Sequence, residues 1–320
     1  MAIRILGTGS YLPEKVVTND ELAQVMDTSD EWISSRTGIR SRHISIADTS
    51  TMMAVKAAEK ALEDGGVKPE ELDHIFVATL SGDHATPSTS CEVQKEIGAV
   101  NAVCMDLNAA CSGFVYALNT AMAYAKAGMG RKMLLIGVET LSKIIDWSDR
   151  STCVLFGDGA GSVVVEADPS RKIYIDAGSD GMKGDVLTCE ERHLNNLLVK
   201  DDSPMQQVQM DGQEVFKFAV RIIPKSVNKI LDAVGVSKEE IKYYLLHQAN
   251  RRIIEAAARR LKEPIEKFPM NLDHCANTSS ATIPILLDEI HRDGMLKAGD
   301  KIILSGFGGG LTWGSVYLEW

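Results

Sequence analysis

No stretch of the 320-residue sequence approaches the roughly 18 consecutive apolar residues that a membrane span needs. The start, MAIRILGTGS, also lacks the longer apolar core of a secretory signal. Positive charge is not in excess either, since the net charge is -10, which argues against non-specific binding to nucleic acid or anionic lipid. We therefore expect a cytoplasmic protein that binds neither membrane nor nucleic acid.

Paired cysteines and nucleotide fingerprints are absent as well. The six cysteines, at positions 91, 104, 111, 153, 189 and 275, stand singly, without the spacing of a zinc or redox motif. The glycine-rich segments 157–161 and 306–310 have neither dinucleotide nor P-loop spacing. We expect no metal and no nicotinamide. The glycines are expected to allow tight turns and close approach of the backbone to a substrate.

The sequence repeats itself. Residues 60–77 align without gaps with residues 229–246, an offset of 169 (229 − 60), and the same offset places 130–138 on 299–307. Each long copy reads as a helix end, a glycine stop, an acidic turn and a buried strand. No Pro- or Ser-rich linker separates the copies. We therefore expect two closely packed α/β halves, residues 1–170 and 171–320.

Helical and strand patterns alternate along the first half. They predict helices over 51–64, over 89–97 and from Cys111, and strands over 74–79, 102–107 and 133–139. Such continuously apolar strands imply sheets that helices cover on both faces.

Cys111 lies in Asn108-Ala-Ala-Cys-Ser-Gly113, which follows a predicted strand and opens an apolar helix. At a helix N-terminus, unpaired N–H groups and the helix dipole lower a cysteine pKa from its usual value of about 8.5 and favour the nucleophilic thiolate. The alternative is a helix start with an incidental buried cysteine. This segment alone favours neither interpretation.

Two polar residues of the second half are further candidates. His247 follows the predicted strand 243–246, at the edge of the sheet where catalytic groups usually gather. A lone histidine is more often a packing or surface residue, but its position near the counterpart of the Cys111 segment favours a function. Asn277 follows a predicted strand, at the mouth of a helix expected to begin near Ser279. Asparagine would suit an N-cap equally well.

Six motifs together resemble, in order and over the whole chain, the signature of the 3-oxoacyl-[acyl-carrier-protein] synthase III family. They are Thr37-Gly-Ile-Arg-Ser-Arg-His-Ile44, Ala110-Cys-Ser-Gly113, Phe156-Gly-Asp-Gly-Ala-Gly161, His247-Gln-Ala-Asn250, Asn277-Thr-Ser-Ser-Ala-Thr282 and Phe307-Gly-Gly-Gly-Leu-Thr-Trp-Gly314. The resemblance implies a duplicated, thiolase-like α/β fold with stacked mixed sheets between helices. It also implies a homodimer and the enzyme that initiates type II fatty acid synthesis.

The resemblance further implies a mechanism. Cys111 takes an acyl group from acyl-CoA while the backbone N–H groups of Cys111 and Gly309 hold the oxyanion. His247 and Asn277 then stabilise the enolate formed by decarboxylation of malonyl-acyl carrier protein. Elongating relatives carry a second histidine and thiolases a second cysteine in the role of Asn277, so this trio indicates the initiating type. CoA is a substrate here, and no cofactor is expected.

By the same resemblance, other residues bind the substrates. Expected CoA contacts are Trp32, Arg36, Arg150, Ala249 and Asn250, with the indole stacked on adenine and the guanidinium groups at the phosphates. A packing role for Trp32 is the alternative. Thr86 and Phe307 are expected at the acyl pocket, and Thr86 is carried there on a loop of the partner subunit. A small side chain at position 86 leaves room for branched or longer primers.

A basic segment follows Asn250. By resemblance, Lys217, Arg252, Arg259 and Arg260 form the landing site of the acidic carrier protein. The alternative is an ordinary solvated helix face. Complementary charge mainly raises the association rate and weakens with salt.

Other functions stay open at this point. One is a related condensing enzyme of polyketide, alkylquinolone or long-chain ketone synthesis, or a starter-unit acyltransferase. Another is a non-catalytic module that binds acyl groups or carrier protein, against which the intact Cys111, His247 and Asn277 argue. Hydroxymethylglutaryl-CoA synthase is disfavoured because no glutamate stands as its acid-base near these motifs.

Overall fold

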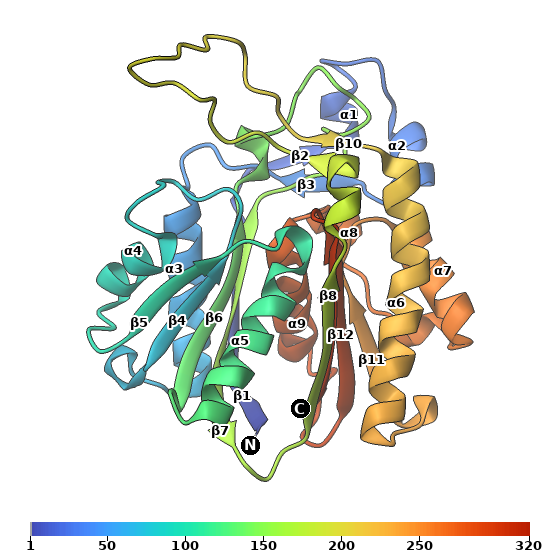
Figure 1. The fold of residues 1–320 in the computed structure, drawn as a ribbon. Helices are drawn as coiled ribbons and strands as arrows, with labels where there is room; N and C mark the ends of the chain where they lie inside the picture. Colours follow the sequence, from blue (N-terminus) through green and yellow to red (C-terminus); the bar gives the residue numbers. More distant parts are fainter. Residues whose placement is uncertain (1) are drawn as a thin grey trace.

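The protein is described by a computed structural model that covers residues 2–320. Its first sheet has five strands in the order β1-β7-β6-β4-β5 (Figure 1). The bounds are β1 Ala2–Tyr11, β4 His74–Ala78, β5 Val103–Leu107, β6 Lys132–Glu139 and β7 Gly159–Asp168. Strands β6, β4 and β5 run parallel, and β7 runs antiparallel to both β6 and β1. The sheet is therefore mixed, as expected.

The second sheet has four strands in the order β11-β12-β13-β8. The bounds are β8 Ile173–Ser179, β11 Ile241–Leu246, β12 Lys301–Gly308 and β13 Thr312–Glu319. Strands β11 and β12 are parallel, whereas β13 is antiparallel to both of its neighbours. This sheet is mixed too.

Helices separate and flank the two sheets. Their bounds are α3 Ser50–Gly65, α4 Thr89–Ile97, α5 Gly113–Ala127, α6 Gly212–Val234, α7 Arg251–Leu261 and α9 Thr282–Arg292. Helices α5 and α9 lie between the sheets, with α3 and α4 outside the first and α6 and α7 outside the second (Figure 1). One buried apolar cluster joins Phe76 of β4, Leu118 of α5, Leu286 of α9 and Leu304 of β12. The core thus continues through both sheets.

Short elements complete the described chain. They are β2 Val16–Thr18, α1 Asn19–Leu22, α2 Asp30–Thr37, β3 Ser41–His43, β9 Leu187–Thr188, β10 Gln209–Met210 and α8 Leu272–Cys275. Elements α1, α2, β2 and β3 form a cap at the end of the molecule opposite the two termini (Figure 1). No helix within residues 2–320 is long and apolar enough to cross a membrane.

The offset of 169 residues recurs in the elements themselves. Pairs at this offset are the helix-ending glycines 66 and 235, the 3₁₀ turns 69–71 and 238–240, the starts of β6 and β12, the 3₁₀ turns 110–112 and 279–281, and the starts of α5 and α9. Strand order agrees as well, because β1-β7-β6-β4 corresponds to β8-β13-β12-β11. The division after residue 170 that we propose falls in the turn between β7 and β8.

Most of the predicted elements of the first half lie within one residue of their expected bounds. Two predictions are wrong. The helix expected from Cys111 begins as the 3₁₀ turn Ala110–Ser112, and α5 starts only at Gly113. The strand expected before Ala276 is the short helix α8. Buried Asn271 turns the chain there, because its N–H donates to Gln248 Oε1 at 3.2 Å and its Nδ2 donates to Glu289 at 2.8 Å.

Candidate active site

A sharp turn presents Cys111 at the end of β5. Asn108 Oδ1 accepts a hydrogen bond from the Ala110 N–H at 3.3 Å, and Ala110 has a φ of 46°. A non-glycine residue in this left-handed region costs on the order of 1 kcal/mol or more, and such strain clusters at functional sites. The turn leaves Cys111 only 9% exposed, two residues before the start of α5.

Cys111 lines a cavity of about 860 Å³. Its walls include residues 79–85, 106–111, 187–192, 279 and 309–310. This volume is typical of a small-molecule site. The cavity therefore has room for a substrate group beside the sulfur.

The state of the thiol differs from the sequence-based expectation. Burial raises the pKa of Cys111 to about 12, although the neighbouring Ser279 hydroxyl opposes the shift. A helix dipole contributes about 0.3–1 kcal/mol, less than one pKa unit, so burial outweighs it. The predicted lowering of the Cys111 pKa is therefore wrong in direction, and a thiol is the form that burial favours.

Glycines of β12 pack directly against Cys111. A Cβ on Gly308 would lie 2.7 Å from the Cys111 nitrogen, and one on Gly306 would lie 3.2 Å from its carbonyl oxygen. Gly309, expected to contribute an oxyanion donor, lines the cavity together with Cys111. Gly306 and Gly308 therefore approach the backbone of Cys111 closely. By contrast, Gly157 and Gly161 approach the backbone of Cys275 and Ile285, and neither lines the cavity.

His247 lies directly after β11 and is 1% exposed. Its N–H donates to Ser305 O at 2.8 Å, and its ring packs edge-on against Phe307 with centroids 5.2 Å apart. Within residues 2–320 its Nδ1 has no hydrogen-bond partner. Burial lowers the pKa of His247 to about 3, so the imidazole is neutral.

Asn277 is fixed at both its backbone and its side chain. Its N–H donates to Leu155 O at 2.9 Å, and its carbonyl accepts from the Gly157 N–H at 3.0 Å. Its Oδ1 accepts from the Ser279 N–H at 2.8 Å. The Asn277 side-chain oxygen therefore has the capping role that the sequence left open. The Nδ2 group of the amide is still a donor that could bind a ligand.

The two halves build the same turn twice. Asn108 and Asn277 are 169 residues apart, and each caps the N–H two residues later. Ser279 has a φ of 51°, close to the 46° of Ala110. In the first half the turn presents Cys111, and in the second it presents the donor Asn277.

Neighbouring residues link the segments of the three candidates, of which Cys111 itself lines the cavity. The Ser279 hydroxyl, two residues after Asn277, hydrogen-bonds to the Cys111 thiol. Phe307, which holds the His247 ring, lies between the two glycines that pack on Cys111. Segments far apart in the sequence thus meet at one point.

Glu139 is a site residue that the sequence reasoning missed. It ends β6 and is completely buried. Its carboxylate accepts hydrogen bonds from Ser81 Oγ at 2.5 Å, Ser280 Oγ at 2.9 Å and Ser279 Oγ at 3.1 Å. Burial raises its pKa, and its charge in turn raises the pKa of Cys111. The sequence does contain a hint of this role, because Glu139 is an acidic residue at the end of the apolar run Met133–Val138.

The expected CoA residues gather around helix α2 of the cap, which holds Trp32 and Arg36. The guanidinium carbons of Arg36 and Arg150 lie 4.8 and 5.3 Å from the Trp32 ring centroid. Asn250 caps α7 and donates from Nδ2 to Arg36 O at 3.2 Å, beside half-buried Ala249. Trp32 is half-buried, so the packing alternative is correct for part of its surface.

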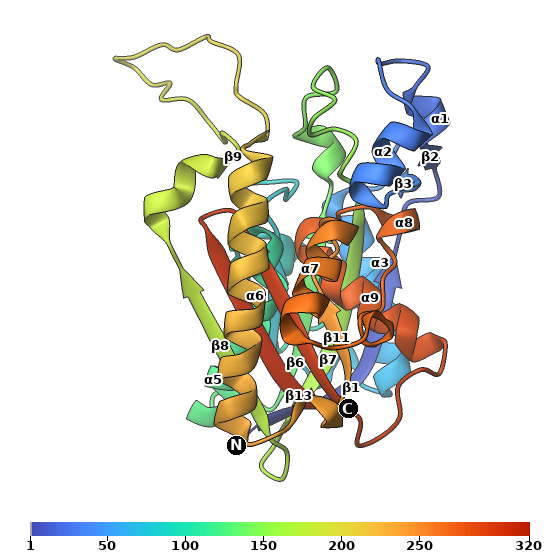
Figure 2. The ribbon, with the colours of Figure 1, turned by 90° about the vertical axis from the view of Figure 1, so that its right-hand side faces the viewer.

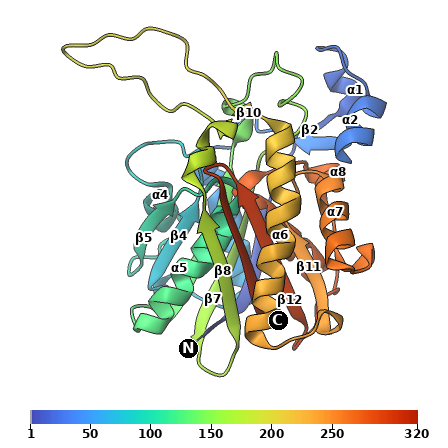
Figure 3. The same cartoon turned by 45° about the vertical axis from the view of Figure 1, so that its right-hand side comes forward.

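The expected carrier-protein residues occupy two neighbouring helices. Lys217 lies on α6, and Arg252, Arg259 and Arg260 lie on α7, all of them exposed. Helices α6 and α7 run side by side on the outside of the second sheet (Figures 2 and 3). Two of the arginines also hold backbone carbonyls, Arg252 that of Ser35 at 2.9 Å and Arg260 that of Val220 at 2.7 Å.

The two expected acyl-pocket residues lie apart from each other. Phe307 is buried against His247. Thr86 is exposed, next to residues 82–85 of the cavity wall. Within one chain Thr86 therefore belongs to the surface.

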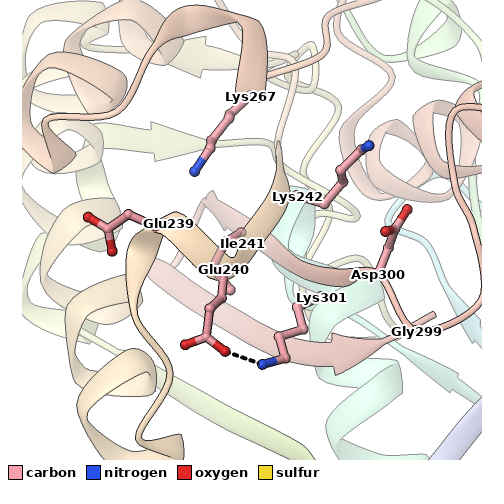
Figure 4. A pocket seen from close by; sticks show the side chains of 8 residues that line it. All are labelled: Glu239, Glu240, Ile241, Lys242, Lys267, Gly299, Asp300 and Lys301. Atoms are coloured by element: carbon pink, nitrogen blue, oxygen red, sulfur yellow. Dashed lines mark hydrogen bonds and ion pairs between the residues drawn. The ribbon is translucent and has the colours of Figure 1, made fainter.

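A second depression, of about 520 Å³, lies at the amino ends of β11 and β12, the ends opposite to those that hold His247 and Gly308. Its walls carry Glu239, Glu240, Lys242, Lys267, Asp300 and Lys301, with Glu240 paired to Lys301 (Figure 4). These charges balance and leave no net attraction for an ion.

One group of metal-binding residue types occurs within residues 2–320. The ligand atoms of His274, Cys275 and Glu289 all lie within 4.8 Å of one another. His274 Nε2 already pairs with Glu289 at 3.4 Å. Internal pairing accounts for this arrangement.

Comparison with known proteins identifies the family. The family model described as 3-Oxoacyl-[acyl-carrier-protein (ACP)] synthase III matches residues 105–181, and its C-terminal counterpart matches residues 231–320. The beta-ketoacyl-[acyl-carrier-protein] synthase III of Clostridium acetobutylicum is 51% identical over 100% of this chain and 99% of its own.

Solved structures agree over the full length. The 3-oxoacyl-[acyl-carrier-protein] synthase III of Aquifex aeolicus has a TM-score of 0.93 and 43% identity, covering 100% of both chains. The Pseudomonas aeruginosa enzyme has a TM-score of 0.93 and 42% identity, covering 100% of this chain and 98% of its own. The thiolase-like fold is thereby confirmed. The chain belongs to the 3-oxoacyl-[acyl-carrier-protein] synthase III family.

Proposed function

We propose that this enzyme joins an acyl group from acyl-CoA to malonyl-acyl carrier protein by decarboxylative condensation and so initiates fatty acid synthesis. One observation carries the proposal. Cys111 stands on a strained turn inside a cavity of about 860 Å³, which Ser279 of the Asn277 turn also lines. Phe307, which packs on the His247 ring, lies between the glycines that pack on Cys111. A nucleophile and two donors are what a two-step acyl transfer and condensation need.

In the first step the Cys111 sulfur attacks the thioester carbonyl of acyl-CoA. The N–H groups of Cys111 and Gly309 hold the oxyanion, CoA leaves as a thiolate, and the acyl group stays on sulfur. The support is the close packing of Gly306 and Gly308 on Cys111, next to Gly309. Donors held by such packing are in place before charge develops.

In the second step malonyl-acyl carrier protein loses CO₂, and negative charge appears on its thioester oxygen. Neutral His247 and the Asn277 amide donate hydrogen bonds to this oxygen, each contributing about 3 kcal/mol if it acts as a typical oxyanion donor. The resulting enolate carbon attacks the acyl-cysteine. Because His247 is neutral, it serves as a hydrogen-bond donor and not as a cation.

The binding roles follow from the same proposal. The Trp32, Arg36 and Arg150 group receives the nucleotide end of CoA, as the two guanidinium groups beside the indole suggest. Lys217, Arg252, Arg259 and Arg260 receive the acidic carrier protein.

A homodimer in the cytoplasm is part of the proposal as well. Strand β5 is at the edge of its sheet with Val103 exposed, and an unpaired edge suits pairing with a second copy. Exposed Thr86 would then reach the partner's acyl pocket.

The test is to supply acetyl-, isobutyryl- and longer acyl-CoA together with malonyl-acyl carrier protein and to identify the products by mass. We expect 3-oxoacyl-acyl carrier protein, free CoA and CO₂ in equal amounts. A product released from the carrier, or acylation with no condensation, would instead indicate a ketone-forming enzyme or a starter-unit transferase.

A further inference from the structure

We propose, building on the proposed function, that Glu139 takes the proton of the Cys111 thiol through the Ser279 hydroxyl during acylation and returns it after condensation. Ser279 lies between the two groups: it lines the cavity with Cys111 and interacts with the Cys111 thiol, and its hydroxyl donates to Glu139 Oε1 at 3.1 Å. Because the one Ser279 hydrogen points to Glu139, the Ser279 oxygen is the acceptor available to the thiol proton. Glu139 is thereby a positioning and proton-holding residue behind the nucleophile.

A proton acceptor is needed because the resting sulfur is a thiol. His247 is poorly suited, since protonating a wholly buried imidazole would create a second buried charge beside the new thiolate. Transfer to Glu139 only moves one buried negative charge from oxygen to sulfur. The pKa shifts agree with this choice of acceptor. Burial lowers the pKa of His247 and so disfavours its protonation, whereas it raises the pKa of Glu139 and so favours proton uptake.

Glu139 has hydrogen-bond partners both as a carboxylate and as a carboxylic acid. As a carboxylate, it accepts from Ser81 Oγ, the Leu80 N–H and the hydroxyls of Ser279 and Ser280. Ser280 has one hydroxyl hydrogen but two close oxygens, Glu139 Oε1 at 2.9 Å and Ala78 O at 2.8 Å. When Oε1 carries the proton, it donates to Ser280 Oγ, and the Ser280 hydrogen turns to Ala78 O.

The proton count balances over the cycle. In acylation the Cys111 proton passes to Ser279 Oγ while the Ser279 hydrogen passes to Glu139, sulfur bonds to the acyl carbon, and CoA leaves as a thiolate that takes a proton from water. In condensation the enolate carbon bonds to the acyl carbon, and the carbon–sulfur bond breaks with its electrons on sulfur. Glu139 then returns its proton through Ser279, so the enzyme ends as it began.

Two neighbouring serines offer a matched pair for the test. Ser279→Ala breaks the proton path through Ser279 but leaves Glu139 in place, whereas Ser280→Ala removes another partner of the same carboxylate oxygen and leaves the path intact. Glu139→Gln keeps the shape but cannot accept a proton. The measurement is the single-turnover rate of acyl-enzyme formation, followed by intact mass after rapid quenching, with the thermal midpoint of each variant recorded.

We expect acylation to slow about a hundredfold in Ser279→Ala and Glu139→Gln, the lower end for loss of a general base. Ser280→Ala should slow it by less than about tenfold, the usual effect of one lost hydrogen bond. The wild-type rate should also fall at low pH as Glu139 takes up a proton, and Glu139→Gln should lose that limb. Equal rates in the two serine variants, or an unchanged pH profile in Glu139→Gln, would overturn the relay.

A measurement on the wild type covers the case in which a variant does not fold. In mixtures of H₂O and D₂O, a relay that moves two protons together predicts a downward-curved plot of acylation rate against deuterium fraction, and a straight line contradicts it. A wild type that acylates normally with no relay signature refutes this inference alone. Failure of the wild type to acylate refutes the proposed function as well.

Discussion

The Asn277 side-chain oxygen accepts the Ser279 N–H at 2.8 Å, in the same way that Asn108 accepts the Ala110 N–H 169 residues earlier. One duplicated turn thus carries both Cys111, the proposed nucleophile, and Asn277, the proposed enolate donor. The capping bond commits the oxygen of the Asn277 amide and leaves its NH₂ group for substrate. A substitution at Asn277 can therefore remove the NH₂ donor while keeping the oxygen that holds the turn.

Asn277→Asp should keep the cap and lose the donor. A carboxylate still accepts the Ser279 N–H, but it repels a developing enolate, so condensation should fall about 10²–10³-fold. Acylation of Cys111 and the thermal midpoint should change little. The two half-reactions are measured separately, the first with acyl-CoA alone and the second by adding malonyl-acyl carrier protein to preformed acyl-enzyme. A variant that condenses at the wild-type rate would remove Asn277 from the mechanism.

His247 should make stability depend on pH. Its folded pKa of about 3 lies below the unfolded value near 6.5, so between these values the unfolded chain binds more protons. The free energy of unfolding should fall as the pH drops through that window, by at most about 1.4 kcal/mol per pH unit from this group. Urea unfolding at pH 7 and pH 5 should show a smaller loss in His247→Ala than in the wild type. Equal losses would mean that His247 titrates normally in the fold.

Gly308→Ala should disable acylation through sterics alone. The added methyl would lie 2.7 Å from the Cys111 nitrogen, so the nucleophile or β12 must shift. A displacement of about 1 Å costs on the order of a hundredfold in rate. Gly181→Ala is the matched control, since its Cβ meets nothing within 4 Å. The measurement is the rate of acyl-enzyme formation in each variant. Equal rates in Gly308→Ala and Gly181→Ala would contradict the close packing of Gly308 on Cys111.

Arg259→Glu should weaken the use of malonyl-acyl carrier protein without affecting acyl-CoA. Reversing an exposed charge on α7 should raise the KM for the carrier substrate about tenfold at low ionic strength, and the difference should narrow as salt screens it. Lys126→Glu makes the same charge change at an exposed position in the last turn of α5, in the first half of the chain, and should leave this KM near the wild-type value. If both variants raise it equally, the effect is one of net charge and no docking surface lies on α7.

Local periodicity and internal repetition were enough to predict the two-sheet architecture and the positions of the three main candidates. The repeat at offset 169 matches β11, which leads to His247, with β4, the neighbour of the strand that leads to Cys111. In the structure the His247 ring packs on Phe307, which lies between the two glycines that pack on Cys111. This worked because parallel strands of duplicated halves end at the same edge of their sheets.

What the sequence did not predict depends on burial. The sign of the Cys111 pKa shift was wrong because local helix position is visible in a sequence, whereas the desolvation that raises the pKa comes from β12 and the 279–281 turn, far along the chain. Glu139 escaped notice for the same reason. Its partners Ser81 and Ser279 come from two other segments. The α8 segment was misassigned because Asn271 anchors it through tertiary hydrogen bonds.

The most direct test of the account is the intact mass of the purified protein after incubation with acyl-CoA, followed by peptide mapping. We predict one acyl group per chain, located on Cys111, absent from Cys111→Ala and removed when malonyl-acyl carrier protein is added. An unmodified protein with every acyl-CoA, or an acyl group on another residue, would contradict the assignment of Cys111 as the nucleophile.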